Sequence, residues 1–354
     1  MLRKLLLGGA LSALGLMALQ TTVTQAQEKV LRVANYGGSF TAAQKKYAGD
    51  LFTRRTGITV QYIDANPVDH LSKLIASKGR EAPYDVVYLD IDVQSNAIKA
   101  GVLDKIDASQ VPNLEKLYDQ AKNPDGYGPG IMFYSIGIAY NVEKFKEAGI
   151  PEPTSWEDLW SEKLKGRVAI PDLSTIMGRC FLVASSRLVG ADESELSKGI
   201  EKIATLEAHS YYNATPTVEA LLTSGDVWAT PMANGRAWGV IDKGLPLRYV
   251  LPKEGGCGGL TTVDIPVGTK MSKEAHQYIN TVLDPLPQLG QAYEIPYGPA
   301  NRTLETTIAA YPKMAERFPS SPAALEQLYI PNWSKYYEGH ADAVDLWNRQ
   351  VIGR

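Results

Sequence analysis

Hydrophobic and polar positions along this 354-residue chain follow two alternating patterns. Short apolar runs rich in β-branched and aromatic residues are typical of strands, and segments with apolar residues every three or four positions are typical of amphipathic helices. In the first third of the chain, each strand-like run precedes a helical segment: VLRVANY (30–36) with 41–55, ITVQYID (58–64) with 68–76, and YDVVYLD (84–90) with 93–100. This repetition predicts βαβ units.

A second series of the same kind follows after residue 166. Its strand-like runs and helical segments are RVAIPD (167–172) with 176–188, HSYYNA (209–214) with 218–223, DVWATP (226–231) with 235–242, and LRYVLP (247–252). Two such series predict an α/β fold of two lobes, with largely parallel sheets and helices on both faces.

The amino terminus has the pattern of a secretory signal peptide. Arg3 and Lys4 precede an apolar core at 5–19, and a polar segment leads to a cleavage site after Ala26. We therefore expect residues 1–26 to be removed and the rest to be a soluble, secreted protein. No later run is long enough to cross a bilayer, so we expect no membrane insertion.

Charge and composition narrow the class of partner. Loss of the two basic residues of the signal segment changes the formal net charge from −3 to −5, and the remaining basic residues are scattered. This pattern has no electrostatic footprint for nucleic acid. Only Cys180 and Cys257 are present, which excludes a disulfide-rich scaffold but leaves open whether these two pair or stay as buried thiols.

Several unusual residues are expected at the carboxyl ends of strands. In open α/β sheets, ligands collect beyond the carboxyl ends of the strands, so these positions are expected to meet in a cleft between the lobes. The positions are Tyr36, Gly37, Gly38 and Ser39, then Asp90 and Asp92, then 172–175, Arg236, and Thr261 with Thr262.

Three longer runs carry a family resemblance: TSWEDLWSEKLKGRVAIPD (154–172), NGRAWGVIDKGLPLRYVLPKEGG (234–256) and IPYGPANR (295–302). In these runs the chain resembles the periplasmic substrate-binding proteins of polyamine ABC importers. The resemblance implies a two-lobed type II binding-protein fold with three crossovers. It also implies a monomer without cofactors that closes on a small molecule and delivers it to a membrane permease.

The division of the chain follows from the same resemblance. We expect residues 27–136 with 259–300 to form lobe 1, and residues 137–258 with 301–354 to form lobe 2. The lobes should rotate about crossovers near Gly137, Gly255–Gly256 and Gly298.

The polyamine pattern is broken at the positions that would hold the ligand. Leu173 and Ile176 occupy places where polyamine binders of this family carry acidic residues. Gly259 and Thr261 replace a tryptophan and an aspartate, and Ala233 replaces an aromatic residue. A linear dication would lose most of its partners, and an unpaired buried ammonium is costly.

The groups that remain favour a ligand with one acidic and one basic end. Arg236, after Asn234-Gly235 at a predicted helix start, suits a carboxylate, and Asp90 or Asp92 suits an amine. The glycines before Ser39 form a second possible anion seat. A γ- or ω-amino acid fits this polarity best; a small dicarboxylate or hydroxy acid is next, and a polyamine remains an alternative.

Structural roles compete with these assignments. Asp90 and Asp92 could cap the following helix, as could Ser174 and Thr175, which are also hydroxyl donors. Arg236 could be a solvated side chain or part of an ion pair within its lobe. Tyr36 and Tyr297 align with aromatic ligand contacts of the family, and one of Thr261, Thr262 and Asp264 is expected to touch the ligand.

The sequence is less consistent with two other classes, metal-binding proteins and enzymes. Ferric iron could bind adjacent tyrosines, and the pairs Tyr211-Tyr212 and Tyr336-Tyr337 are both present. However, Tyr211 and Tyr212 lie in a predicted strand, where neighbouring side chains point to opposite faces. The histidines show no metal-ligand spacing. No nucleophile elbow, phosphate-binding loop or zinc-protease motif occurs, so we expect a binding protein and not an enzyme.

Overall fold

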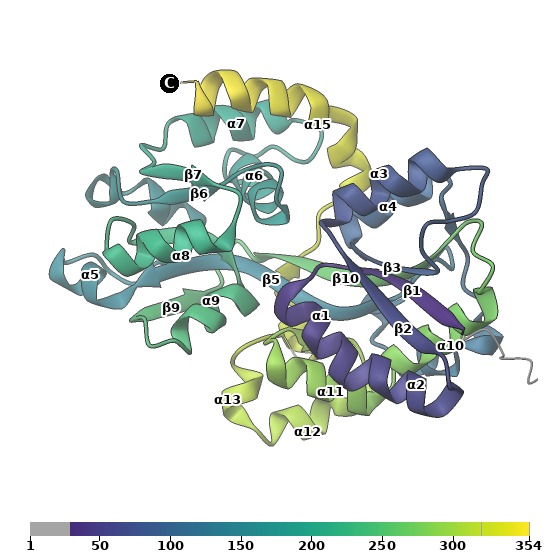
Figure 1. The fold of residues 1–354 in the computed structure, drawn as a ribbon. Coiled ribbons are helices and arrows are strands. Elements are labelled where there is room, and N and C mark those ends of the chain that lie inside the picture. The colour runs from purple at the N-terminus through teal and green to yellow at the C-terminus, as the bar shows by residue number, and fades with distance from the viewer. Residues whose placement is uncertain (1–28, 320, 354) are drawn as a thin grey trace, which may run out of the picture.

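The computed structural model describes residues 29–319 and 321–353. The predicted signal segment, residues 1–26, lies outside this range. The chain forms two lobes, seen on the right and left of Figure 1, with two long strands running between them. Within the described residues, no helix combines the length and apolar character needed to cross a bilayer.

Lobe 1 is built on the first βαβ series. Strand β1 (Val30–Asn35) lies between β2 (Thr59–Asp64) and β3 (Val86–Asp90) and pairs with both in parallel. The helices of this lobe are α1 (Gly38–Gln44), a π-helical turn (Lys45–Gly49), α2 (Asp50–Thr56), α3 (Pro67–Ser77), α4 (Ile91–Ala100), α10 (Ser272–Val282) and α11 (Pro285–Glu294). The predicted elements of this series are therefore present within a few residues of their expected bounds.

Lobe 2 contains the second series around a separate core. A short parallel pair, β6 (Ala169–Pro171) and β7 (Ser210–Tyr212), lies beside β8 (Ala229–Ala233), and the lobe also contains β9 (Leu247–Val250). The helices are α5 (Val142–Glu147), α6 (Ile176–Leu188), α7 (Leu196–Ala204), α8 (Thr215–Ser224) and α9 (Asn234–Ile241).

Two long strands join the lobes, and the hydrophobic periodicity of the sequence predicted neither of them. Strand β5 (Gly130–Asn141) and strand β10 (Gly256–Pro266) are antiparallel and buried along their whole length. Because both faces of each strand are covered, neither shows the alternating pattern of a half-buried strand. The main sheet is consequently mixed, which corrects the expectation of largely parallel sheets: β10 is antiparallel to β3, and β5 is antiparallel to β8 and β9.

Strand β5 passes from one lobe to the other at Ile136 and Gly137. Residues before this point pair with β10 and β11 (Gly298–Pro299), and residues after it pair with β8 and β9. A Cβ on Gly137 would lie 2.3 Å from the carbonyl oxygen of Val250, so only glycine allows the neighbouring strand to approach this closely.

The carboxyl-terminal division differs from the expected one. The segment after residue 301 was assigned to lobe 2, but Leu304, Ile308 and Phe318 pack with Ala292 of α11, on lobe 1. This segment holds α12 (Glu305–Ala309), α13 (Pro312–Ala315) and α14 (Pro322–Glu326). The chain crosses to lobe 2 later than the predicted crossover at Gly298, near β12 (Leu328–Tyr329), which pairs with β10.

The last helix, α15 (Trp333–Trp347), contacts both lobes. It packs against α7 of lobe 2 and also against α4 of lobe 1, and it lies along the top of the molecule in Figure 1. The remaining short elements are β4 (Leu103–Asp104), a π-helical end (Asn348–Ile352) and 3₁₀ turns at Ala108–Gln110, Pro112–Lys116, Asp119–Ala121, Trp156–Trp160, Glu162–Leu164 and Arg302–Leu304.

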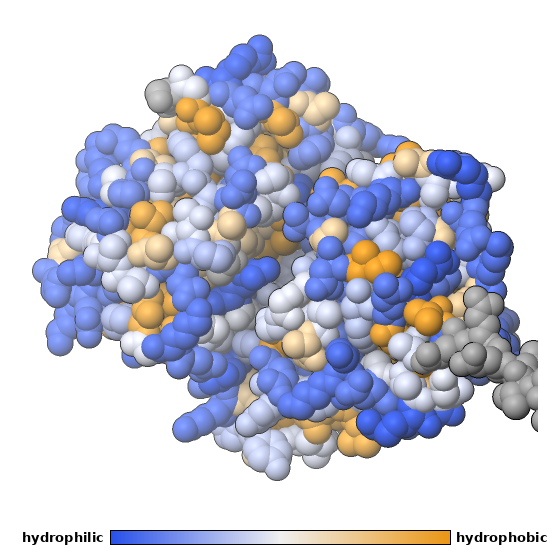
Figure 2. Space-filling view, viewed as in Figure 1, coloured by the Kyte–Doolittle hydropathy of each residue, from blue (hydrophilic) through white to orange (hydrophobic). Residues whose placement is uncertain are grey.

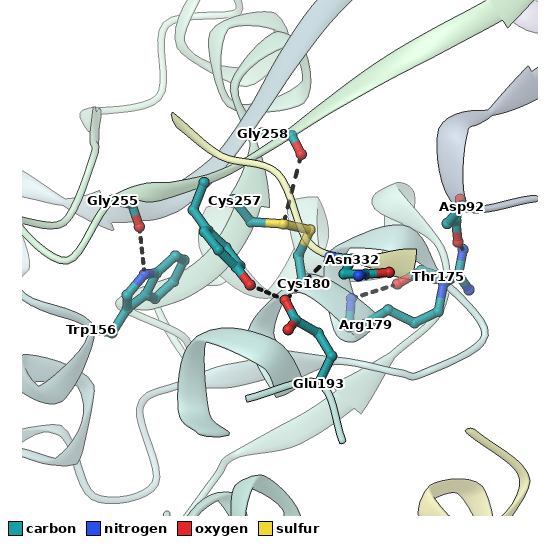
Figure 3. The surroundings of a disulfide bond; sticks show 12 residues. Asp92, Trp156, Thr175, Arg179, Cys180, Glu193, Gly255, Cys257, Gly258 and Asn332 are labelled. Carbon is teal, nitrogen blue, oxygen red and sulfur yellow. Dashed lines mark hydrogen bonds and ion pairs between the residues drawn. A yellow bond between two sulfur atoms is a disulfide. The ribbon is translucent and has the colours of Figure 1, made fainter. Parts of the chain in front are cut away.

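A disulfide resolves the question that the sequence left open about the two cysteines. Cys180 of α6 is bonded to Cys257 at the start of β10, with 5.7 Å between their Cα atoms (Figure 3). Trp156 packs nearby and donates its indole N–H to the carbonyl of Gly255, 3.2 Å away. These contacts attach the beginning of the crossover strand to the core of lobe 2.

Candidate ligand-binding site

The surface is hollowed between the two lobes, as Figure 2 shows in the same orientation as Figure 1. Charged and aromatic residues from both lobes lie close enough at this junction for their charges to interact. They come from the ends of β1 and β3 in lobe 1, the start of α9 in lobe 2, and the loop before β11. The residues that carry these interactions are Tyr36, Asp90, Tyr134, Arg236 and Tyr297.

On the lobe 1 side, Tyr36 and Asp90 form one unit. The hydroxyl of Tyr36 donates to Oδ1 of Asp90, 3.0 Å away. Asp90 occupies the cap position of α4, but its side chain makes no capping hydrogen bond, so helix capping does not account for this carboxylate. Thr261 lies opposite Asp90 in the pairing of β10 with β3, and its side chain also contacts the Tyr36 hydroxyl.

The environment of Asp90 disfavours its charge. Burial, followed by the nearby negative charge of Asp92, raises the pKa of Asp90 to about 7 from an ordinary value of 3.8. The positive charges of Arg179 and Arg236 and the Tyr36 hydrogen bond act in the opposite direction and do not cancel the effect. An ammonium group placed beside Asp90 would supply the missing counter-charge.

This raised pKa gives a testable pH dependence. Between about pH 4 and pH 7 the folded protein holds a proton on Asp90 that the unfolded chain has released, so the stability of the empty protein falls as pH rises through this window. We expect Asp90→Asn to flatten part of this fall when melting temperature is measured from pH 4.5 to 7.5.

The exposed Asp125, in a turn of lobe 1, offers a matched control. Asp125→Asn should retain the full wild-type slope of melting temperature against pH. Identical slopes for wild type and Asp90→Asn would show that Asp90 is ionised throughout this range.

On the lobe 2 side, Arg236 is exposed in the first turn of α9. Its guanidinium has no hydrogen bond or ion pair within residues 29–319 and 321–353. The start of α9 is held by Asn234, whose Oδ1 accepts from the Ser135 N–H and whose amide donates to the carbonyls of Pro296 and Arg317. Arg236 therefore projects a free positive charge from a fixed backbone.

Two tyrosines lie between these charges. Tyr297 is close enough to both Arg236 and Asp90 for their charges to act on it, and burial raises the pKa of its hydroxyl. Its ring covers Gly235, where a Cβ would come within 2.6 Å of the ring. The rings of Tyr134 and Tyr297 pack edge to face, with 6.3 Å between their centroids. The hydroxyl of Tyr134 is buried and has no hydrogen-bond partner among the described residues.

Asp92 does not present a free carboxylate. Its side chain is fully buried and accepts from Arg179 of α6, with 2.7 Å between Nη2 and Oδ2, and from the hydroxyl of Tyr337 at 3.0 Å. From the sequence, Asp90 and Asp92 are equivalent candidates for binding an amine. In this arrangement only Asp90 lacks a cationic partner, and Arg179 and Tyr337 went unrecognised because their separation in sequence gives no signal.

Thr262 and Asp264 hold lobe 1 together internally. Asp264 is fully buried and accepts from the Gln94 amide, the Gly128 N–H and the Thr262 hydroxyl. Burial raises the pKa of Asp264 to about 6. Of the three residues expected at the return to lobe 1, Thr261 is therefore the one beside Tyr36 and Asp90.

The two hydroxyl residues before α6 have different surroundings. Thr175 caps the helix: its Oγ1 accepts from the Gly178 N–H at 3.1 Å and donates to the Asp172 carbonyl at 2.9 Å. Ser174 is exposed, and its carbonyl oxygen accepts from Arg179. Of the two roles considered for Thr175, the structure therefore shows the helix cap.

The glycine turn after β1 has backbone angles that favour glycine, with φ of +88° at Gly37 and +59° at Gly38. The Gly37 N–H donates to the hydroxyl of Thr41, which in turn donates to the carboxylate of Asp64. A Cβ on Gly37 would lie 3.3 Å from Asp64. A negative group therefore already borders the predicted anion seat, which makes it a poorer carboxylate site than Arg236.

The tyrosine pair considered for iron is split as the strand pattern predicts. Tyr212 donates its hydroxyl to the Pro231 carbonyl, whereas the Tyr211 ring packs against Trp347. Across the described residues, no group of three or more histidine, cysteine or acidic side chains is arranged to hold a metal ion.

Comparison with curated proteins finds distant relatives whose names refer to the binding of putrescine or spermidine. The chain is 24% identical to spermidine/putrescine-binding periplasmic protein 1 of Haemophilus influenzae, over 85% of this chain and 82% of the relative. It is 27% identical to the putrescine-binding periplasmic protein SpuD of Pseudomonas aeruginosa, over 94% and 98% of the two chains.

Comparison with solved structures finds the same two-lobed fold. The Atu4243 GABA receptor matches with a TM-score of 0.76 at 21% identity, covering 90% of this chain and 97% of that one. The binding protein AgtB of A. tumefaciens R10, solved with agropinic acid, matches with a TM-score of 0.69 at 22% identity, covering 92% and 99%. The periplasmic binding-protein fold expected from the sequence is confirmed.

The sequence profile of one protein family matches residues 48–316, well over half of the chain. This protein belongs to the family of bacterial extracellular solute-binding proteins, the solute-binding components of ABC transporters.

Proposed function

We propose that this protein is the periplasmic receptor of an ABC importer for a small zwitterion, such as γ-aminobutyrate or another ω-amino acid. The observation that carries this proposal is the free guanidinium of Arg236 on one lobe facing a region that contains the uncompensated carboxyl of Asp90 on the other. A carboxylate would bind Arg236 through charge-assisted hydrogen bonds, and an ammonium would bind beside Asp90.

The aromatic residues between these charges suit the apolar part of such a ligand. Tyr36 reaches Asp90, and Tyr297 lies within the fields of both charged groups. A short methylene chain between an amine and a carboxylate would pack against these rings. Ser39, Gly37, Gly38, Ser174 and Thr175 remain candidate contacts at the rims of the same cleft.

Closure is proposed to occur about β5, β10 and the late crossover at β12. A solute that contacts Arg236 on lobe 2 and Asp90 on lobe 1 stabilises the closed arrangement, because only that arrangement satisfies both of its ends. The closed receptor would then deliver the solute to its membrane permease.

A polyamine is the second candidate, favoured by the names of the curated relatives. The cleft offers a diamine the carboxyl of Asp90, which lacks a cationic partner, and it adds the positive charge of Arg236. Two structural neighbours with the same fold are a GABA receptor and AgtB in complex with agropinic acid. The names of these ligands support an anion-receiving site in this protein.

The test is calorimetric titration of protein that has been unfolded, dialysed and refolded to remove carried-over solute. The probes are γ-aminobutyrate, putrescine and succinate, and a thermal-shift screen extends the panel, since a ligand at 100 times its Kd stabilises the folded state by about 2.7 kcal/mol. We expect γ-aminobutyrate to bind most tightly of the three. Tight binding of putrescine with no response to either carboxylate would overturn the proposal.

A further inference from the structure

An ion pair joins the two lobes beside the proposed cleft. Asp92 lies in the first turn of α4 in lobe 1, and Arg179 lies in α6 of lobe 2. Their side chains are 0% and 5% exposed and approach to 2.7 Å, and Figure 3 shows Arg179 extended toward Asp92. Tyr337 of α15 donates to the same carboxylate oxygen at 3.0 Å.

Arg179 is held in place by lobe 2 itself. Its Nη1 donates to the carbonyls of Leu173 at 3.1 Å and Ser174 at 3.0 Å. The next residue, Cys180, is tied by the disulfide to Cys257 of the crossover strand. The guanidinium is therefore preorganised to meet Asp92 and is not free to turn toward other groups in the cleft.

Hydrogen-bonding capacity remains unused at this junction. In the described part of the chain, Oδ1 of Asp92, Nε of Arg179 and the Tyr134 hydroxyl are all buried without a partner. Asp92 is two residues from Asp90, and the charges of both act on Tyr134. The pair is thus continuous with the proposed ligand site and is not an isolated surface contact.

Two of the four charged side chains at the junction pair within the protein, and the other two are left for a ligand. Arg179 cancels Asp92 within the protein, which leaves Asp90 and Arg236 as one negative and one positive group for a ligand. A diamine would need a second carboxylate, and Asp92, two residues from Asp90, is already occupied by Arg179.

We propose that Arg179 determines the charge selectivity of the cleft by withdrawing Asp92 from the ligand, so that zwitterions are accepted and diamines are rejected. This inference rests on the proposed function, since it concerns selection at the same site. It assigns a specificity role to a residue that would make no contact with a bound zwitterion.

The first test is Arg179→Gln, which frees Asp92 while keeping a polar side chain. We expect the affinity for putrescine to rise at least about fivefold over wild type, and putrescine to raise the melting temperature of the variant more than that of wild type. Arg248→Gln is the matched control, because it removes one positive charge from an exposed strand position of lobe 2. The control should show no gain for putrescine.

The reverse change tests the same idea if Arg179→Gln does not fold. Asp92→Asn keeps an acceptor for Tyr337 but leaves Arg179 without a counter-charge, so the affinity for succinate should rise relative to γ-aminobutyrate. The double variant Asp92→Asn/Arg179→Gln restores neutrality, and neither putrescine nor succinate should gain.

The outcomes separate this inference from the proposed function. If wild type prefers γ-aminobutyrate but neither single variant shifts the order of preference, the inference about Arg179 is wrong and the proposed function stands. If the wild-type protein binds putrescine tightly and does not bind either carboxylate, the proposed function is wrong, and the inference that depends on it is wrong as well. A shift toward putrescine in Arg179→Gln and toward succinate in Asp92→Asn supports both.

Discussion

Replacing Arg236 with alanine is expected to weaken the binding of γ-aminobutyrate by about ten- to a hundredfold. The reason is the loss of charge-assisted hydrogen bonds to the ligand carboxylate, which are worth about 1.5–3 kcal/mol. Because Arg236 is exposed and has no hydrogen bond or ion pair within the described residues, the melting temperature of the empty protein should stay within about 1 °C of wild type.

Calorimetric titration and thermal unfolding of the same preparations measure both effects. Arg248→Ala serves as the control, since Arg248 is also an exposed arginine of lobe 2 but pairs with Glu152. Its affinity for γ-aminobutyrate should equal that of wild type. Unchanged affinity in Arg236→Ala would show that the carboxylate binds elsewhere, and the polarity proposed for the cleft would have to be abandoned.

Loss of the disulfide is expected to have the largest effect on stability. Cys180 and Cys257 are 77 residues apart, so their bond removes much conformational freedom from the unfolded chain. Disulfides typically contribute about 2–4 kcal/mol in this way. Cys180→Ala/Cys257→Ala should therefore unfold several degrees below wild type and at a lower denaturant concentration.

Reduction provides a control for the cavity left by the alanines. A reducing agent should lower the melting temperature of wild type toward that of the double variant and should leave the double variant unchanged. Equal melting temperatures for oxidised wild type, reduced wild type and the variant would mean that the bond contributes nothing to stability.

The sequence predicted the helices and strands whose hydrophobic pattern is local. Helix α6 was predicted at 176–188 and is found at Ile176–Leu188, and β1 to β3 lie within the predicted runs. Hydrophobic periodicity did not reveal the buried strands β5 and β10, because a strand covered on both faces has no alternation to detect.

At the candidate site, too, the sequence indicated the residues that have a local signal but not the distant partners that decide their roles. Asp90 and Arg236 could be named from sequence, since each follows a strand-like run at a sheet edge where ligands collect. Asp92 was named with them, but its availability depends on Arg179, 87 positions later, and on Tyr337 in the last helix. Thr262 and Asp264 were placed near the cleft by their position, whereas their hydrogen bonds turn inward to Gln94 and Gly128.

The amino-acid sequence by itself determined the α/β class, the family resemblance and the residue types available at the strand ends, because these depend on short-range periodicity and on contiguous motifs. Only the tertiary structure decided that the sheet is mixed, that Leu304, Ile308 and Phe318 pack on lobe 1, that Cys180 bonds Cys257, and that Arg179 neutralises Asp92. Each of these depends on contacts between segments far apart in the chain, and such contacts are selected by packing and burial of the whole molecule, which no local pattern records.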